Sequence, residues 1–234
     1  MARIWHLSYI LVIALVVFFF IRPVKVDPLA FQAALIEHTD NFGSSTWLGK
    51  PIWQPTLDVW TLQETLFEIK PDLLIECGTY KGGSSYFFGD MFDLMGNGRV
   101  ITVDIVKLHN LSHPRVTYLI GDCASPEIVA QIRAERDKVT GPVMVLLDSD
   151  HSAAHVRKEL DAYHSFVTPG SFLHVQDGVI DVQPMFAAAR PGPLVAIESF
   201  VAEHSEFEVD LARSNRFLIT HHPKGWLRRK QTER

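Results

Sequence analysis

The alternation of short aliphatic segments with helix-forming segments constrains the fold of this chain more than any other feature. Five aliphatic segments are predicted strands, at residues 72–76, 99–104, 115–120, 143–148 and 171–177. Two further β runs, FEVDLA and RFLIT, lie too close together for a crossover helix and predict a C-terminal hairpin. The order predicts an α/β fold whose parallel sheet carries helices on both faces and one antiparallel strand.

Helix signals separate these strands. Residues 58–70 predict a helix with one apolar face, formed by Trp60, Leu62, Leu66, Phe67 and Ile69. Ser125, followed by Pro126, is the predicted N-cap of a later helix, and Ser152 is that of the next.

The N-terminal segment is strongly apolar. Residues 7–21, LSYILVIALVVFFFI, carry no charge, and FFFIRP at their end does not resemble a signal-peptide cleavage site. A span of the bilayer takes roughly 17–25 residues, so this run is short. We interpret residues 1–25 as an uncleaved membrane anchor, with a signal peptide or a buried helix as alternatives. Residues 26–57 are then a linker and irregular cap, and 58–234 are the main domain.

Charge and cysteine content exclude two classes of protein. The net charge of −5 and the absence of an internal basic block argue against nucleic-acid binding. Cys77 and Cys123 are too few for a disulfide framework, and we expect both to be reduced.

A glycine-rich loop, CGTYKGGSS, follows Glu76 at the end of the first strand. Its spacing matches neither dinucleotide-binding nor phosphate-binding motifs, so a cationic, phosphate-free cofactor such as S-adenosylmethionine fits better. A helix-capping turn is the alternative. Asp104 ends the second strand and is placed to bind ribose hydroxyls, with a helix cap or turn as the alternative. Asp122 follows the third strand and could line the adenine, with an ordinary turn as the alternative. The candidate cofactor-binding residues are Glu76, Gly78, Thr79, Gly82, Gly83, Ser84, Asp104 and Asp122.

Acidic residues also end the fourth and fifth strands. Asp148 and Asp150 follow one strand, and Gln176 and Asp177 follow the other. Carboxylates at neighbouring strand ends repel unless a cation lies between them, and oxygen ligands suit Mg²⁺ or another hard divalent ion. His151 is the candidate general base, because histidine exchanges protons near neutral pH. In the alternative interpretation, Asp148 and Asp150 cap the next helix and His151 only packs against neighbouring side chains.

The other histidines indicate less. His174 lies in a predicted strand and is expected in the core, whereas His221 and His222 are expected in an exposed loop without metal.

Several motifs together resemble the cephalosporin hydroxylase family, which includes rhamnosyl O-methyltransferases. They run in order from about residue 41 to 229, as TWLGKPIWQPTLDVWTLQE, PDLLIECGTYKGGSS, GNGRVITVDI, LLDSDHSAAHVRKEL, VQD and PGPLVAIESF. The resemblance implies a Rossmann-like, seven-stranded class I methyltransferase fold, S-adenosylmethionine, and Mg²⁺-assisted transfer to a sugar-type hydroxyl. It also places Glu76, Gly78 and Gly83 in the cofactor loop and Asp104 at the ribose, and leaves open whether Asp148 or Asp150 is the direct metal ligand. The spacing to Asp177 also resembles that of catechol-type O-methyltransferases, which favours Asp148 and implies His151 as the catalytic base.

The sequence departs from the family pattern at two places. The acidic pair that is usually Glu-Asp is Gln176-Asp177 here, which predicts weaker metal binding. The Gly-His-Pro usually found after that pair is replaced by Val-Gln-Pro at 182–184.

The resulting hypothesis is a membrane-anchored O-methyltransferase, with its catalytic domain in the cytoplasm, that acts on a sugar or lipid-linked sugar. A non-catalytic accessory protein on the same scaffold is the first alternative, and a hydroxylase is the second. Homo-oligomerisation is left open.

Overall fold

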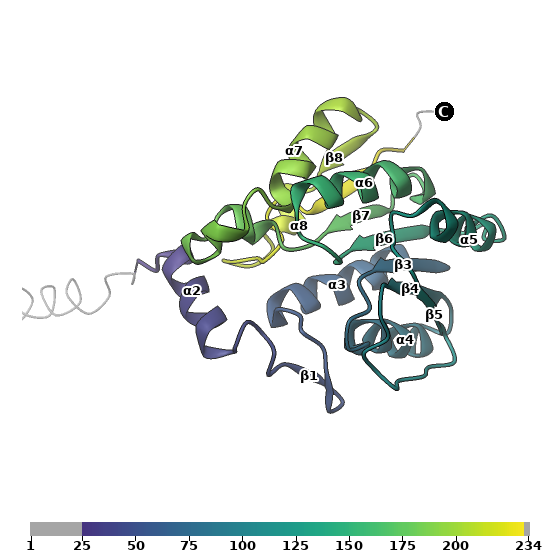
Figure 1. Cartoon of the computed structure of the whole chain (residues 1–234), viewed down its shortest axis with the longest axis horizontal. Coiled ribbons are helices and arrows are strands. Elements are labelled where there is room, and N and C mark those ends of the chain that lie inside the picture. The colour runs from purple at the N-terminus through teal and green to yellow at the C-terminus, as the bar shows by residue number, and fades with distance from the viewer. Residues whose placement is uncertain (1–24, 232–234) are drawn as a thin grey trace, which may run out of the picture.

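The computed structural model describes residues 25–231 as a central sheet flanked by helices (Figure 1). Seven strands form the sheet in the order β5-β4-β3-β6-β7-β9-β8. Their bounds are β3 Leu73–Cys77, β4 Arg99–Asp104, β5 Val116–Ile120, β6 Val143–Leu147, β7 Phe172–Val175, β8 Phe207–Val209 and β9 Trp226–Arg229. Strands β3 to β7 pair in parallel, and β9 runs antiparallel between β7 and β8. The predicted α/β class and single antiparallel strand are confirmed.

Helices cover both faces of this sheet (Figure 1). They are α2 Pro28–His38, α3 Thr56–Ile69, α4 Gly83–Met95, α5 Pro126–Arg136, α6 Ala153–Tyr163, α7 Pro193–Glu203 and the short α8 Leu211–Ser214. Three 3₁₀ turns add η1 His164–Phe166, η2 Gly178–Asp181 and η3 Pro184–Ala189. A small hairpin, β1 Thr46–Trp47 and β2 Lys50–Pro51, precedes α3.

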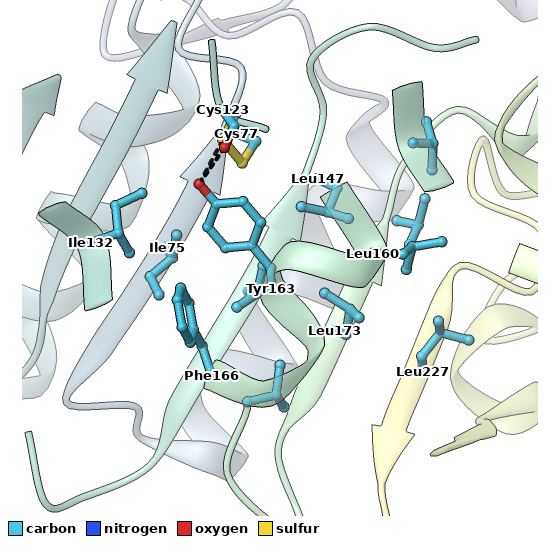
Figure 2. Packing of buried hydrophobic residues seen from close by; sticks show 14 of the residues in the cluster. Ile75, Cys77, Cys123, Ile132, Leu147, Leu160, Tyr163, Phe166, Leu173 and Leu227 are labelled. Atoms are coloured by element: carbon cyan, nitrogen blue, oxygen red, sulfur yellow. Dashed lines mark hydrogen bonds between the residues drawn. A yellow bond between two sulfur atoms is a disulfide. The ribbon is translucent and has the colours of Figure 1, made fainter. Parts of the chain in front are cut away.

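The alternation of side chains along each strand divides the core into two layers. Ile75 of β3 packs in the same cluster as Leu160 and Tyr163 of α6 (Figure 2). Leu74, its neighbour in β3, belongs instead to the cluster that contains Phe88 of α4. Full burial of such a side chain contributes roughly 1.5–3 kcal/mol, so the sheet-facing sides of the helices provide most of their stability.

Two serine caps fix where α5 and α6 begin. The Ser125 side chain accepts a hydrogen bond from the Ile128 N–H, and the Ser152 side chain accepts one from the His155 N–H. Both predicted N-caps are confirmed. The cap at Ser152 starts α6 directly after the acidic loop that follows β6, and so holds that loop at the sheet edge.

The C-terminal hairpin differs from the prediction. β8 lies within FEVDLA as expected, but RFLIT forms no strand, and the partner of β8 is β9, Trp226–Arg229. The aliphatic pattern of RFLIT was misleading because Leu218 is 60% exposed. Strand β9 was not predicted because its last two residues are arginines, which interrupt the apolar pattern.

The helical segments also bring two corrections. In α3, Trp60 and Phe67 are 57% and 60% exposed and do not belong to the buried face. Helix α2 forms inside the segment that we expected to be a linker, because Asp27 accepts hydrogen bonds from the Leu29 and Ala30 N–H groups and caps it. The proposed boundary between cap and main domain stays a prediction.

The predicted membrane anchor is contradicted. Among residues 25–231, no helix has the length and apolar character needed to cross a bilayer. Helix α3, at 14 residues, extends only about 21 Å, whereas a hydrocarbon core is roughly 30 Å thick. The predictions of a transmembrane helix and of a membrane-anchored catalytic domain in the cytoplasm are therefore withdrawn. Residues 1–24, on which they were based, lie outside the described residues.

Candidate active site

A cavity of about 560 Å³ opens where the parallel strands end at their carboxyl side. Loops after β3, β4, β5, β6 and β7 supply one part of its lining, and residues 41–55 and 221–222 supply the rest. Ligands of open α/β sheets bind at this edge, so the fold places the cavity where the sequence keeps its acids.

The glycine-rich loop lets backbone segments approach each other at this edge. Gly78 has φ +99°, and a Cβ on it would lie 1.9 Å from the carbonyl oxygen of Asp148. A Cβ on Gly83 would lie 2.0 Å from the carbonyl oxygen of Pro51. Both glycines line the cavity together with Thr79 and Ser84, whereas Gly82 caps α4 and does not line it.

Glu76 is fully buried behind this loop and does not line the cavity. The Ser84 hydroxyl donates a hydrogen bond of 2.6 Å to Glu76 Oε1, while Oε2 has no partner among the described residues. Burial raises the pKa of Glu76, and hydrogen bonds from Ser84 and Thr102 oppose that rise. Glu76 therefore positions Ser84 at the cavity wall.

Asp104 and Asp122 both line the cavity, at the ends of β4 and β5. The Tyr80 N–H donates to Asp104 Oδ2 at 2.7 Å, which ties the glycine-rich loop to the neighbouring strand. Asp122 Oδ1 accepts from the Ala124 N–H at 2.9 Å. Both retain carboxylate oxygens for a ligand, and their roles in cofactor binding stay predictions.

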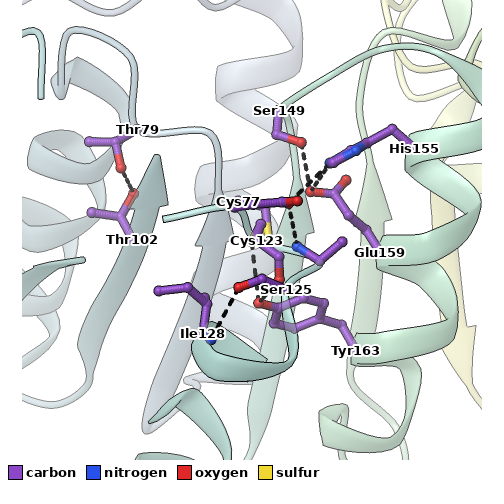
Figure 3. The surroundings of a disulfide bond; sticks show 12 residues. Cys77, Thr79, Thr102, Cys123, Ser125, Ile128, Ser149, His155, Glu159 and Tyr163 are labelled. Carbon is purple, nitrogen blue, oxygen red and sulfur yellow. Dashed lines mark hydrogen bonds and ion pairs between the residues drawn. A yellow bond between two sulfur atoms is a disulfide. The ribbon is translucent and has the colours of Figure 1, made fainter. Parts of the chain in front are cut away.

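A disulfide joins Cys77 and Cys123 at this edge (Figure 3), which corrects the expectation of two reduced cysteines. The Cα atoms lie 5.9 Å apart although 46 residues separate the two cysteines. The loop after β5 passes the end of β4 to reach β3, a path that sequence spacing does not reveal. Tyr163 fixes this loop, because its hydroxyl donates to the Cys123 carbonyl at 2.8 Å.

The acidic end of the cavity brings Asp148, His151 and Asp177 together. One donor atom from each of these residues lies within 4.8 Å of the others. His151 Nε2 is 3.1 Å from Asp177 Oδ2. The predicted convergence of the fourth and fifth strand ends therefore occurs, since β6 and β7 are paired neighbours.

The protonation of Asp148 depends on this crowding. Burial raises the pKa of Asp148 well above its usual range, and the carboxylates of Asp177 and Glu76 raise it further. A carboxyl group in such surroundings is stabilised by a proton, by an amide N–H or by a cation.

Asp150 lies apart from this group. It lines the cavity, but its Oδ1 accepts a hydrogen bond from the Ser152 N–H at 2.7 Å. Hydrogen bonds from Ser152 lower the pKa of Asp150, so it is an ionised residue of the turn before α6. Between the two aspartates that the sequence left open, the geometry favours Asp148 as the ligand.

Sequence reasoning missed three polar residues of the site. Gln54 is 4% exposed and donates to both Asp148 and Gln176. His221 and His222 are buried and line the cavity, contrary to the expectation of an exposed loop. Burial lowers the pKa of His222 well below its usual range, and its Nδ1 accepts the Asp177 N–H at 2.9 Å. The Gln54-Pro55 pair belongs to the family motif in the cap segment and was the available signal for Gln54. The sequence does not show that Gln54 contacts Gln176, because 122 residues separate them.

The donor set fits a hard divalent cation. Asp148 and Asp177 provide carboxylate oxygens, and the side-chain amide of Gln176, which can present its oxygen to a cation, lies beside Asp148. Oxygen donors of this kind are the ligands that Mg²⁺ prefers. The pKa of Asp148 is raised by burial and by neighbouring carboxylates, and a cation at this position would relieve the same repulsion.

Comparisons with known proteins identify the family of this chain. The family model described as Rhamnosyl O-methyltransferase/CmcI matches residues 40–230. The chain is 33% identical over 191 residues to the rhamnosyl O-methyltransferase of Mycobacterium tuberculosis (strain H37Rv), covering 78% of this chain and 77% of that protein. It is 31% identical over 194 residues to the rhamnosyl O-methyltransferase of Mycobacterium leprae, covering 81% and 85%.

Two solved structures share the fold. CmcI with Mg and SAM superimposes with a TM-score of 0.64 at 20% identity, covering 82% of this chain and 78% of that one. The MycE methyltransferase with Mg and SAH gives a TM-score of 0.51 at 18% identity, covering 74% and 49%. The predicted Rossmann-like methyltransferase sheet is confirmed by this likeness.

Proposed function

The chain belongs to the rhamnosyl O-methyltransferase/CmcI family and is an S-adenosylmethionine-dependent O-methyltransferase, and we propose that it methylates a sugar hydroxyl with the help of a divalent cation. The family suggested by the sequence motifs is thereby confirmed. The accessory protein and the hydroxylase, which the sequence left open, are set aside.

The convergence of Asp148, His151 and Asp177 beside the glycine-rich loop carries the proposal. Asp148, Asp177 and the amide oxygen of Gln176 would hold the cation. A divalent cation bound there would act as a Lewis acid that lowers the pKa of a substrate hydroxyl. The structures of CmcI and of the MycE methyltransferase contain Mg, which supports the proposal of a divalent cation.

His151 is the proposed proton acceptor. It lines the cavity, and its Nε2 faces Asp177 at 3.1 Å, a carboxylate that would stabilise the protonated ring. S-adenosylmethionine bound beside the glycine-rich loop would supply the methyl group and leave as S-adenosylhomocysteine, with the electrons of the broken carbon–sulfur bond kept on sulfur. His151 would take the proton of the hydroxyl oxygen that bonds to the methyl carbon.

The acceptor half of the cavity suits a sugar ring. Phe42, Ile52 and Trp53 give the cavity apolar surface, and the Phe42 ring contacts that of His221 at 5.0 Å, so apolar and polar groups lie side by side. Binding sites of this kind combine an apolar wall with a few polar groups that orient the ligand. The curated relatives named rhamnosyl O-methyltransferase support a deoxysugar as the acceptor.

The test is product identification. The full-length chain is incubated with methyl-labelled S-adenosylmethionine, Mg²⁺ and either a simple rhamnoside or a glycolipid extract, and the products are hydrolysed to monosaccharides. Label in an O-methylated sugar, lost with EDTA and restored by Mg²⁺, is the expected result. Label outside the sugar would contradict the acceptor class, and full activity in EDTA would contradict the role of the cation.

A further inference from the structure

The carboxylate of Asp148 accepts a hydrogen bond from one of two side-chain amides that bond to each other. Gln54 Nε2 donates to Asp148 Oδ2 at 2.9 Å and to Gln176 Oε1 at 2.7 Å. Gln176 Nε2 donates back to Gln54 Oε1 at 3.1 Å, so the two amides bond reciprocally. Gln54 and Gln176 are 4% and 1% exposed, which limits the access of water to the bonds between them, whereas Asp148 is partly exposed to the cavity. We call Gln54 and Gln176 the amide pair.

The two ends of a glutamine amide can face Asp148 in turn. With the reciprocal bonds above, Gln176 Oε1 is the atom that faces Asp148, whereas the reversed amide would donate its nitrogen to Asp148 Oδ2 at 2.8 Å and Oδ1 at 3.1 Å. The nitrogen donates to the carboxylate directly, whereas the oxygen would share a cation with it. A glutamate at this position presents only oxygen, and its charge beside Asp148 and Asp177 would require a cation or a proton.

We propose that the amide pair takes the place of a divalent cation at Asp148, so that cation and Gln54 compete for the same carboxylate. Gln54 is then a positioning residue that keeps Asp148 in place when no cation is bound. This inference builds on the proposed function, because the cation site is the one described above.

The competition has a direct consequence for affinity. A cation that binds Asp148 through Oδ2 and Gln176 through Oε1 must displace the Gln54 N–H from both oxygens. Removing that N–H should therefore strengthen cation binding, and adding a carboxylate at 176 should strengthen it further through Coulomb attraction. If Gln54 were itself a ligand through its side-chain oxygen, removing its amide would weaken cation binding instead.

The experiment measures cation binding rather than turnover. The full-length wild-type protein, Gln54→Ala and Gln176→Glu are freed of metal with EDTA, dialysed, and titrated with Mg²⁺ and Mn²⁺ by calorimetry. Thermal unfolding midpoints are recorded with and without cation. We expect Gln54→Ala and Gln176→Glu each to bind about tenfold or more tightly than wild type, the first because a competing hydrogen bond to a charged group is removed and the second because a negative charge is added. The cation should also raise their midpoints by more than it raises that of wild type.

Another buried amide pair in the chain provides the matched control. Gln183 Nε2 donates to Gln32 Oε1 at 3.0 Å, and neither residue lines the cavity. Gln32→Ala removes a buried amide as Gln54→Ala does, so it controls for a general loss of stability. Its cation affinity should equal that of wild type. Adding Asp177→Asn to Gln176→Glu should weaken the new binding, which would locate it at the strand ends.

The outcomes separate this inference from the proposed function. Equal cation affinity in wild type, Gln54→Ala and Gln176→Glu would overturn the competition while leaving the cation site standing. Weaker binding by Gln54→Ala would overturn it in favour of Gln54 as a ligand. Absence of cation binding from all variants, Gln176→Glu included, would overturn both this inference and the cation-assisted part of the proposed function.

Discussion

His151 and Asp177 connect the carboxyl ends of two neighbouring strands, with His151 Nε2 lying 3.1 Å from Asp177 Oδ2. His151 follows β6, and Asp177 follows β7 at a left-handed backbone position with φ 58°. The Asp177 N–H is held by His222, which comes from the segment before β9. The candidate proton acceptor and its carboxylate therefore depend on three separate parts of the chain.

The two aspartates after β6 should differ in their effect on cation binding. Asp148 belongs to the converging donor group, whereas Asp150 is engaged by Ser152. We expect Asp148→Asn to weaken Mg²⁺ binding by about tenfold or more, and Asp150→Asn to leave it nearly unchanged. Isothermal titration of both variants measures this difference. Equal losses in the two variants would mean that Asp150 is a ligand after all.

The close backbone approach at Gly78 predicts a large effect of an added methyl group. Gly78 and Gly96 both have positive φ, at +99° and +77°, but a Cβ on Gly96 meets nothing within 4 Å. Gly96→Ala should cost about 1–2 kcal/mol of unfolding free energy from backbone strain alone. Gly78→Ala should cost roughly 1–3 kcal/mol more, because its Cβ meets the Asp148 carbonyl, and it should weaken S-adenosylmethionine binding. Urea unfolding and calorimetry test both statements, and similar losses in the two variants would refute the steric argument.

The disulfide predicts a stability that depends on reductant. Cross-linking residues 46 apart limits the unfolded chain, which in the chain-entropy account is worth about 4 kcal/mol within an observed range of roughly 0–5 kcal/mol. Wild-type protein should lose about 2–4 kcal/mol of unfolding free energy in dithiothreitol. The double variant Cys77→Ser, Cys123→Ser should show no such dependence. A wild-type protein that is insensitive to reductant would contradict the cross-link.

Asp58 predicts how stability changes with pH. Burial raises the pKa of Asp58 from 3.8 to about 6, although the Thr220 hydroxyl and His221 N–H donate to it. Because the folded state binds the proton more tightly, this contribution to stability is present at low pH. It is lost as pH rises through about 6. From pH 4.5 to 7, the unfolding free energy of wild type should fall by about 2 kcal/mol relative to Asp58→Asn. A constant difference across that range would disagree with the raised pKa.

Local patterns predicted the parallel strands well because β3, β6 and β7 are buried along their whole length and β4 everywhere but at its ends. The predicted strand at 99–104 coincides with β4, and the other parallel strands differ from their predictions by one or two residues at an end. RFLIT failed because an aliphatic pattern without a partner strand does not form a strand. β9 was missed because arginines occupy its last two positions, where the pattern of a buried strand has aliphatic residues.

The acids of the site could be predicted from position, but their partners could not. Asp148 and Asp177 each follow a recognisable strand, and parallel strands bring such ends together. Gln54 meets Gln176 across 122 residues, and its segment has no periodic pattern that would indicate a site. The Cys77–Cys123 bond depends likewise on the path of one loop across β4.

The rate of methyl transfer by His151→Gln tests the central claim most directly. The claim requires His151 to accept the proton of the substrate hydroxyl beside Asp177, and general-base catalysis typically contributes about 10²–10⁴-fold. We predict a loss of that size in kcat, with unchanged S-adenosylmethionine affinity and an unchanged thermal midpoint. A variant that transfers methyl groups at the wild-type rate would contradict the account.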